Sequence, residues 1–182
     1  MGTRQLPRTD PRGSGAEATT FRTSDLHGLL PARSATVPSG MPAVADPGSR
    51  LVAMAHRHNI RVIPLSGPSS ILMALAASGM NGQSFRFHGY LPVKNPQRRD
   101  RIRQLEHVAR ATGETQIFME TPYRNMKLLE GLLGICKTGT LLCIAADISL
   151  ESEFIRTKTM GEWKKKLPDI HKRPAVFMIS CE

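Results

Sequence analysis

The sequence contains few cysteines and no long apolar run. The three cysteines, Cys136, Cys143 and Cys181, are an odd number without a C-x-x-C pair. We therefore expect neither a disulfide framework nor a zinc site, and we place the chain in a reducing compartment, the cytoplasm. The histidines offer no alternative metal site, because His56 and His58 would point to different faces of a helix. Since no apolar run reaches the roughly 18 residues of a membrane span, no membrane association is expected.

The chain also lacks a secretory signal and the glycine-rich motif of common nucleotide sites. Its N-terminus has no apolar segment. No G-x-G-x-x-G is present, so an ordinary Rossmann dinucleotide site is not indicated. What is present fits a globular protein. The 182 residues, 40% of them apolar and 22% charged, suffice for one sizeable core or two small lobes.

Positive charge is the unusual bulk property. The net charge is +10, and residues 1–39 carry only five basic and three acidic side chains, so +8 of it lies in the remaining 143 residues. A basic folded domain favours a polyanionic partner, above all nucleic acid. On charge alone, simple solubility is an equally good explanation.

Residues 1–39 differ in composition from the rest of the chain. They are rich in Pro, Arg, Ser, Thr and Gly and show no apolar alternation. Such a composition buries too little apolar surface to offset the entropy lost on ordering. We therefore predict that this segment is disordered or loosely attached.

From Gly40 onward, predicted strands alternate with predicted helices, which indicates α/β layers. Asp46 and Pro47 mark the start of a helix that ends near Asn59, and the apolar segment Ile71–Ser78 should be a helix buried between other elements. Further helices are predicted at 96–111, from 121 to about 136 and around 163, and strands at 60–65, 84–91, 115–120, 140–146, 154–159 and 175–181. The strand at 140–146 is continuously apolar, which is typical of a strand covered on both faces.

Turns with glycine or proline lie where predicted strands pass into helices. Glycine admits a ligand close to the backbone, and a helix N-terminus offers free N–H groups. The segments are GMPAVADPG (40–48), VIPLSGPSS (62–70), FHGYLPVK (87–94) and FMETPYRN (118–125). In order and spacing they resemble the tetrapyrrole-methylase-like methyltransferases, also called class III. The nearest branch resembles the small-subunit rRNA ribose 2′-O-methyltransferase group.

This resemblance implies a methyltransferase of two α/β lobes that binds S-adenosyl-L-methionine in the cleft between them. Matched residue by residue, the cofactor-binding positions are Ser39, Gly40, Met41, Val44, Ser69, Ser70, Glu120 and Ile148. The alternative for Ser69 and Ser70 is plain helix capping, and the alternative for Glu120 is an exposed strand end. No residue is assigned as the catalytic base.

The rRNA branch implies a cytidine ribose of the ribosomal small subunit as the methyl acceptor, with a homodimer as one option. Cations near a helix N-terminus oppose the helix dipole, so phosphate binding explains the basic start of the helix at 96–111 better than local stability does. The residues are Lys94, Arg98, Arg99, Arg101 and Arg103. One alternative is a solvated basic face. Another is a tetrapyrrole or other small acceptor whose carboxylates these residues would hold.

The resemblance begins abruptly at Gly40, without the strand and Pro-Gly loop that the family has upstream. We therefore expect residues 1–39 to lie outside the family fold, with a truncated or aberrant origin. Residues 40–82 should form an incomplete N-terminal cofactor lobe, and residues 83–182 a C-terminal α/β lobe. This leaves a further alternative for function, an inactive remnant that at most binds nucleic acid or a protein partner.

Overall fold

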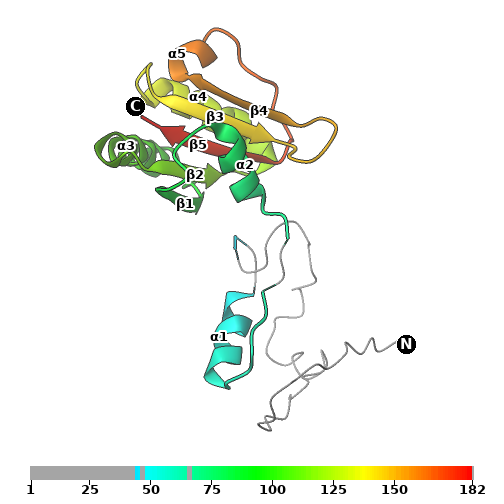
Figure 1. Ribbon diagram of the computed structural model, residues 1–182. Coiled ribbons are helices and arrows are strands. Elements are labelled where there is room, and N and C mark those ends of the chain that lie inside the picture. The colour runs from blue at the N-terminus through cyan, green and yellow to red at the C-terminus, as the bar shows by residue number, and fades with distance from the viewer. Residues whose placement is uncertain (1–43, 46–47, 65–66, 182) are drawn as a thin grey trace. The chain divides into compact units, whose positions relative to one another are not determined.

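The computed structural model describes residues 44–45, 48–64 and 67–181 (Figure 1). Residues 48–64 belong to one compact unit, whereas residues 44–45 and 67–181 belong to a second. Within these ranges, no helix is both long and apolar enough to cross a membrane. The disorder predicted for residues 1–39 and the helix start predicted at Asp46 and Pro47 lie outside the described residues.

One helix, α1 (Ser49–Arg57), occupies the described part of the first unit. Its N-cap is Gly48, and Asn59 adopts a left-handed φ of 53° just beyond the helix, which confirms the predicted stop. The strand predicted at 60–65 is wrong over residues 60–64, which form no strand. A strand needs a neighbour to pair with, and the one sheet among the described residues contains no segment of this unit.

The second unit is built on a five-stranded sheet with the order β1-β2-β5-β3-β4. Its strands are β1 (Phe85–Tyr90), β2 (Thr115–Met119), β3 (Leu141–Ala146), β4 (Phe154–Thr159) and β5 (Ala175–Ser180). Aliphatic and aromatic residues dominate β3 and β5 and alternate with polar ones in β1, and the predicted strands agree with the observed ones to within one residue at each end. With helices packed on this sheet, the predicted α/β class is confirmed.

Three of the strands end at the same edge of the sheet. β1 and β2 are parallel, and β5 is antiparallel to both β2 and β3, so β1, β2 and β3 share one direction. The register fixes their ends, because Tyr90 lies opposite Met119, and Val176 lies opposite both Met119 and Ala145. The side of the sheet where these three strands end is called the carboxyl edge below. In open α/β sheets, ligands bind beyond such an edge.

Alternation along the strands divides the core between two faces of the sheet. The helices of this unit are α2 (Ser70–Ser78), α3 (Asn95–Thr112), the 3₁₀ turn η2 (Pro122–Arg124), α4 (Asn125–Ile135) and α5 (Met160–Trp163). Leu142 and Phe177 lie in one core cluster with residues of α3, α4 and α5. Cys143 and Met178 lie in the other, with residues of α2. Both faces of β3 are therefore covered, as predicted, with α2 in front of the sheet in the view of Figure 1.

Helix α2 packs against the sheet with one side only. Ser69 is its N-cap and accepts a hydrogen bond from the Leu72 N–H at 3.5 Å, and Gly79 ends it with a φ of 73°. Ile71 is buried, whereas Leu72 and Met73 are 48% and 37% exposed. The expectation of a helix buried between other elements is met only on the side of α2 that packs on the sheet.

Helix α2 belongs to the same compact unit as the sheet, and residues 48–64 before it belong to the other unit. The Thr157 hydroxyl of β4 donates to the carbonyl of Ser78 at 2.7 Å. The compact unit that contains the sheet accordingly includes α2, although the predicted boundary after residue 82 assigns this helix to the first lobe. The arrangement of two lobes around a cofactor cleft stays a prediction.

Candidate functional site

The segments that follow three strands lie at the carboxyl edge. Residues 91–94 follow β1, Glu120 follows β2, and Asp147 follows β3. Both acidic residues are buried, with 3% and 8% of their surface exposed. Buried carboxylates require charged or hydrogen-bonding partners, so each of them defines a built polar site at this edge.

Glu120 forms a buried ion pair with Arg98 of α3. The Arg98 Nη2 atom lies 3.8 Å from Glu120 Oε2, and the two side chains are 3% and 0% exposed. The second carboxylate oxygen, Oε1, accepts hydrogen bonds from the Thr121 N–H at 2.7 Å and from Arg124 Nε and Nη2 at 2.9 and 2.7 Å. Glu120 is therefore not an exposed strand end, and that alternative is wrong.

Arg98 also holds the loop that follows β1. Its Nε and Nη2 atoms donate to the carbonyls of Pro92 and Val93 at 2.9 and 2.7 Å. The loops after β1 and β2 are thus tied together by one guanidinium group. Two buried atoms of this tie, Arg98 Nη1 and Glu120 Oε2, have no hydrogen-bond partner among the residues that the structure describes. A donor and an acceptor are available there for a ligand or water.

Asp147 organises the segment after β3. Its carboxylate accepts from Arg173 Nε at 2.7 Å and from the Ser152 hydroxyl at 2.8 Å. Burial of Asp147 acts to raise the pKa of its carboxyl, but the hydrogen bonds and the charge of Arg173 outweigh it and lower the pKa. The residue has a left-handed φ of 51°, so the chain turns sharply before Ile148. Ile148 is half-buried against the cluster that contains α2.

The predicted cofactor residues are only partly placed. Ser39, Gly40 and Met41 lie outside the described residues. Val44 is 44% exposed, and Ser69 is buried as the N-cap of α2. The capping role of Ser69 is therefore observed, whereas Ser70 is exposed and makes no side-chain hydrogen bond within the described residues. The role of all these residues in cofactor binding stays a prediction.

The predicted phosphate-binding residues fall into two groups. Lys94, Arg99 and Arg103 are exposed on or next to the first turns of α3. Arg98 is buried and Arg101 is half-buried, each with specific partners in the protein. Contrary to the prediction, local stability does explain the position of Arg98, because its side chain pairs with Glu120 and with two carbonyls.

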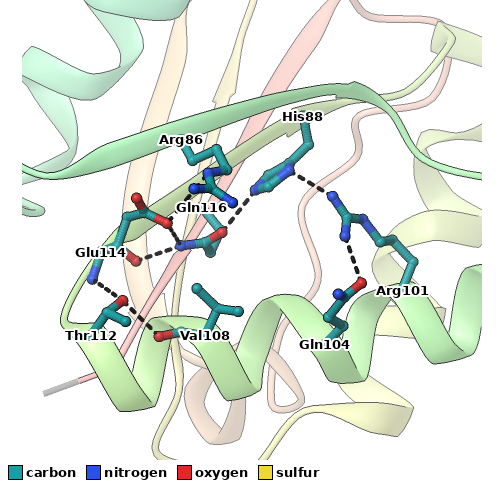
Figure 2. Close-up of polar contacts among 8 residues, drawn as sticks. All are labelled: Arg86, His88, Arg101, Gln104, Val108, Thr112, Glu114 and Gln116. Atoms are coloured by element: carbon teal, nitrogen blue, oxygen red, sulfur yellow. Dashed lines mark hydrogen bonds and ion pairs between the residues drawn. The ribbon is translucent and has the colours of Figure 1, made fainter.

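Arg101 takes part in a second polar network, between β1 and α3. Figure 2 shows His88 between Arg101 and Gln116, with Nδ1 2.8 Å from Arg101 Nη2 and Nε2 2.7 Å from Gln116 Oε1. A guanidinium group only donates, so Nδ1 accepts and the proton of the neutral ring lies on Nε2. Gln116 in turn donates to Glu114 Oε2 at 2.9 Å. Burial is the main cause that lowers the pKa of His88, and the charges of Arg101 and Arg86 add to it, although the hydrogen bond to Gln116 and the charge of Glu114 act to raise it.

The stability of the protein should therefore depend on pH through His88. A free histidine has a pKa of about 6.5, and the folded state holds it lower, so below this pH the unfolded state binds more protons. The free energy of unfolding should fall as pH decreases from about 7.5 to 5.5. Chemical denaturation at a series of pH values measures this. His88→Gln should flatten the dependence, whereas His107→Gln, on the exposed side of α3, should retain it. An unchanged slope in His88→Gln would contradict the assignment.

Several residues of these sites carried no signal in the sequence. Arg124 appeared only as part of the segment FMETPYRN, without a role of its own. The pairing of Asp147 with Arg173 joins residues that are 26 positions apart. His88 and Gln116 meet only because β1 and β2 are neighbours. Within the described residues, no three His, Cys, Asp or Glu side chains gather as metal ligands would.

Comparison with known proteins supplies the family. The family described as Tetrapyrrole (Corrin/Porphyrin) Methylases matches residues 32–164. Proteins named "Ribosomal RNA small subunit methyltransferase I" from Vibrio cholerae and Mesorhizobium japonicum are 32% and 39% identical over 124 and 122 residues. Their counterpart from Escherichia coli O157:H7 is 31% identical over 144 residues. These alignments cover 68%, 67% and 78% of this chain, and 42%, 40% and 49% of the relatives, so the chain spans at most about half of their length.

Solved structures with little sequence identity share the fold. The crystal structure of the methyltransferase CobJ superposes with a TM-score of 0.52 at 21% identity, covering 79% of this chain and 62% of that one. A conserved hypothetical protein from Aeropyrum pernix K1 gives 0.55 at 16% identity, covering 79% and 56%. The resemblance drawn from four short motifs is therefore confirmed by a match over more than half of the sequence. This chain belongs to the tetrapyrrole (corrin/porphyrin) methylase family.

Proposed function

We propose that the chain belongs to an S-adenosyl-L-methionine-dependent methyltransferase that modifies a cytidine ribose 2′-hydroxyl in small-subunit ribosomal RNA. The observation that carries this proposal is the set of relatives at 31–39% identity that are named as ribosomal RNA small subunit methyltransferases. The four sequence motifs add support, because they resemble the same branch of the family. The chain spans at most about half of the relatives' length. Methyl transfer by this chain is therefore a proposal, and the experiment below tests it on the chain itself.

Residues at the carboxyl edge and at the start of α2 fit the cofactor. Glu120 Oε2 is buried without a hydrogen-bond partner among the described residues, and it would accept from a ribose hydroxyl. Ser70 offers an exposed hydroxyl at the start of α2, whose free N–H groups favour the carboxylate of a methionine moiety. When bound, S-adenosyl-L-methionine supplies a methyl group on a positively charged sulfur, which is already a strong electrophile. The chain therefore needs to bind and orient the two reactants more than to activate them.

The exposed cations support RNA as the acceptor. Lys94 and Arg99 lie at the start of α3, directly beyond the carboxyl end of β1, and Arg103 lies one turn of the helix after Arg99. Lys94 and Arg99 have no ion-pair partner in the described part of the chain, whereas Arg103 lies 3.2 Å from the exposed Asp100. These positive charges fit an RNA backbone next to the proposed cofactor position.

The proposal is tested by methyl transfer. The chain is incubated with S-adenosyl-L-methionine labelled in the methyl group and with small ribosomal subunits from cells that lack the relative. Label in a cytidine ribose of the small-subunit RNA supports the proposal. Label in an added corrin or porphyrin, but not in RNA, would favour the small-molecule alternative. RNA binding without any transfer would favour the inactive binding module.

RNA affinity should depend on the exposed cations and on salt. Lys94→Ala with Arg99→Ala should weaken RNA binding, and each phosphate that is no longer neutralised should lower the slope of log Kd against log salt by about 0.7 on single strands. Binding isotherms at four or more salt concentrations measure the slope. Lys137→Ala with Lys165→Ala removes the same charge from exposed positions after the C-terminal ends of α4 and α5 and is the matched control. An equal change in the control would mean that only net charge matters.

A further inference from the structure

The two tyrosines of the chain both lie exposed at the carboxyl edge. Tyr90 is the last residue of β1 and is 58% exposed, and Tyr123 lies in η2, just after β2, and is 74% exposed. Val93, between β1 and α3, is also 56% exposed. Large aromatic side chains exposed to solvent near the ends of two neighbouring strands are typical of a binding surface rather than of a core.

The segments next to these tyrosines, after β1 and after β2, are fixed to each other. Arg98 donates to the carbonyls of Pro92 and Val93 in the loop after β1, and it pairs with Glu120 at the start of the loop after β2. Glu120 in turn accepts from the backbone N–H of Thr121, two residues before Tyr123. The buried ion pair therefore fixes the backbone next to both tyrosines. A fixed backbone reduces the conformational entropy that is lost when the tyrosines bind a ligand.

The surroundings of the tyrosines are cationic. Lys94 is exposed next to Val93, and the Lys172 ammonium lies 5.9 Å from the centre of the Tyr123 ring. A hydrogen bond of 3.1 Å from the Lys172 N–H to the Pro122 carbonyl holds the loop that contains Lys172 against η2. The segments 90–95 and 120–125 contain a single carboxylate, Glu120, which is buried and paired. Exposed rings beside cations suit a ligand with flat aromatic faces and negative charges.

We propose that Tyr90 and Tyr123 form a stacking platform for unpaired bases of the RNA substrate, with Lys94 and Lys172 placed for the adjoining phosphates. This inference rests on the proposed function and says how the RNA that accepts the methyl group is held. Unpaired bases stack on aromatic side chains, and cations beside the rings bind the backbone. In a duplex the base faces are covered by their neighbours, so the platform selects single-stranded over double-stranded RNA.

The test measures the affinity of the full chain for a single-stranded RNA oligonucleotide and for a duplex of the same length. Tyr90→Ala and Tyr123→Ala should each weaken single-strand binding by about fivefold to a hundredfold and leave duplex binding unchanged. Tyr90→Phe and Tyr123→Phe keep the ring and should stay within about twofold of the unaltered chain. The slope of log Kd against log salt should not change in any of the four variants, because no charge is removed.

Phe85 provides the matched control. It is an aromatic residue of the same strand, 39% exposed, at the end opposite Tyr90. Phe85→Ala should leave single-strand affinity unchanged, and thermal unfolding shows whether each variant is folded. If the alanine variants bind like the unaltered chain while Lys94→Ala with Arg99→Ala weakens binding, the platform is wrong and the proposed function stands. If the unaltered chain binds no RNA, both fall. Loss of corrin or porphyrin binding in place of RNA binding would overturn the platform and assign the rings to a small acceptor.

Discussion

Replacing Glu120 by glutamine should lower the free energy of unfolding by about 3 to 5 kcal/mol. The substitution keeps the size of the side chain but removes the carboxylate that pairs with Arg98, whose side chain is 3% exposed. Arg98 would then hold a positive charge away from water with two carbonyl oxygens as its remaining partners. Breaking one member of a buried pair is costly for this reason, since the partner is left uncompensated. Urea denaturation measures the change as a shifted midpoint at a constant slope.

A double-mutant cycle separates the ion pair from other effects. Arg98→Met in the Glu120→Gln background removes the stranded charge, so the double variant should be more stable than the sum of the two single changes predicts. Arg124, which is partly exposed, can turn to solvent when Glu120 is replaced and should contribute less. Glu130→Gln on the exposed side of α4 is the control and should change stability little. A cost for Glu120→Gln as small as that of the control would mean that water already screens the pair.

The sequence contained enough information to find the strands of the sheet. Each strand is a short apolar or alternating segment bounded by turn residues, and β3 shows by its continuous run LLCIAA that both faces are covered. It did not contain the order of the strands, because pairing of β5 between β2 and β3 joins segments far apart in the chain. The segment 60–65 illustrates the same limit. Its residues have the composition of a strand, yet the described part, 60–64, has no partner in the sheet.

The candidate site was predictable in position but not in pairing. Motifs placed Glu120 and Ile148 after two strands, and the shared direction of β2 and β3 brings both to one edge. Charge alone grouped Arg98 with its neighbours, although the structure uses Arg98 internally and leaves Lys94 and Arg99 exposed. A count of charges cannot distinguish a cation that faces solvent from one that faces a buried carboxylate. Burial decides this, and burial depends on which strand ends beside which helix.

S-adenosyl-L-methionine should raise the stability of the chain if the cofactor assignment holds. A ligand that binds only the folded state stabilises it by RT ln(1 + [L]/Kd), which is about 2.7 kcal/mol at a hundredfold excess over Kd. Thermal unfolding at increasing concentrations of S-adenosyl-L-methionine, and of its demethylated product, measures this as a rising midpoint. ATP shares the adenosine and adds charge, so it is the control for nonspecific binding to a basic chain. No shift at millimolar cofactor would contradict cofactor binding by this chain.

The two serines before and in α2 allow cofactor binding to be separated from helix capping. Ser69 caps the helix, so Ser69→Ala should cost about 1 kcal/mol without any ligand. Ser70 is exposed at the first helical position, so Ser70→Ala should leave the ligand-free midpoint nearly unchanged. If the Ser70 hydroxyl binds the cofactor, this variant should still need several-fold more S-adenosyl-L-methionine for the same shift, because one hydrogen bond is worth about 0.5 to 1.5 kcal/mol. Equal shifts in the Ser70→Ala variant and the unaltered chain would remove Ser70 from the cofactor site and leave Glu120 as its best-placed polar group.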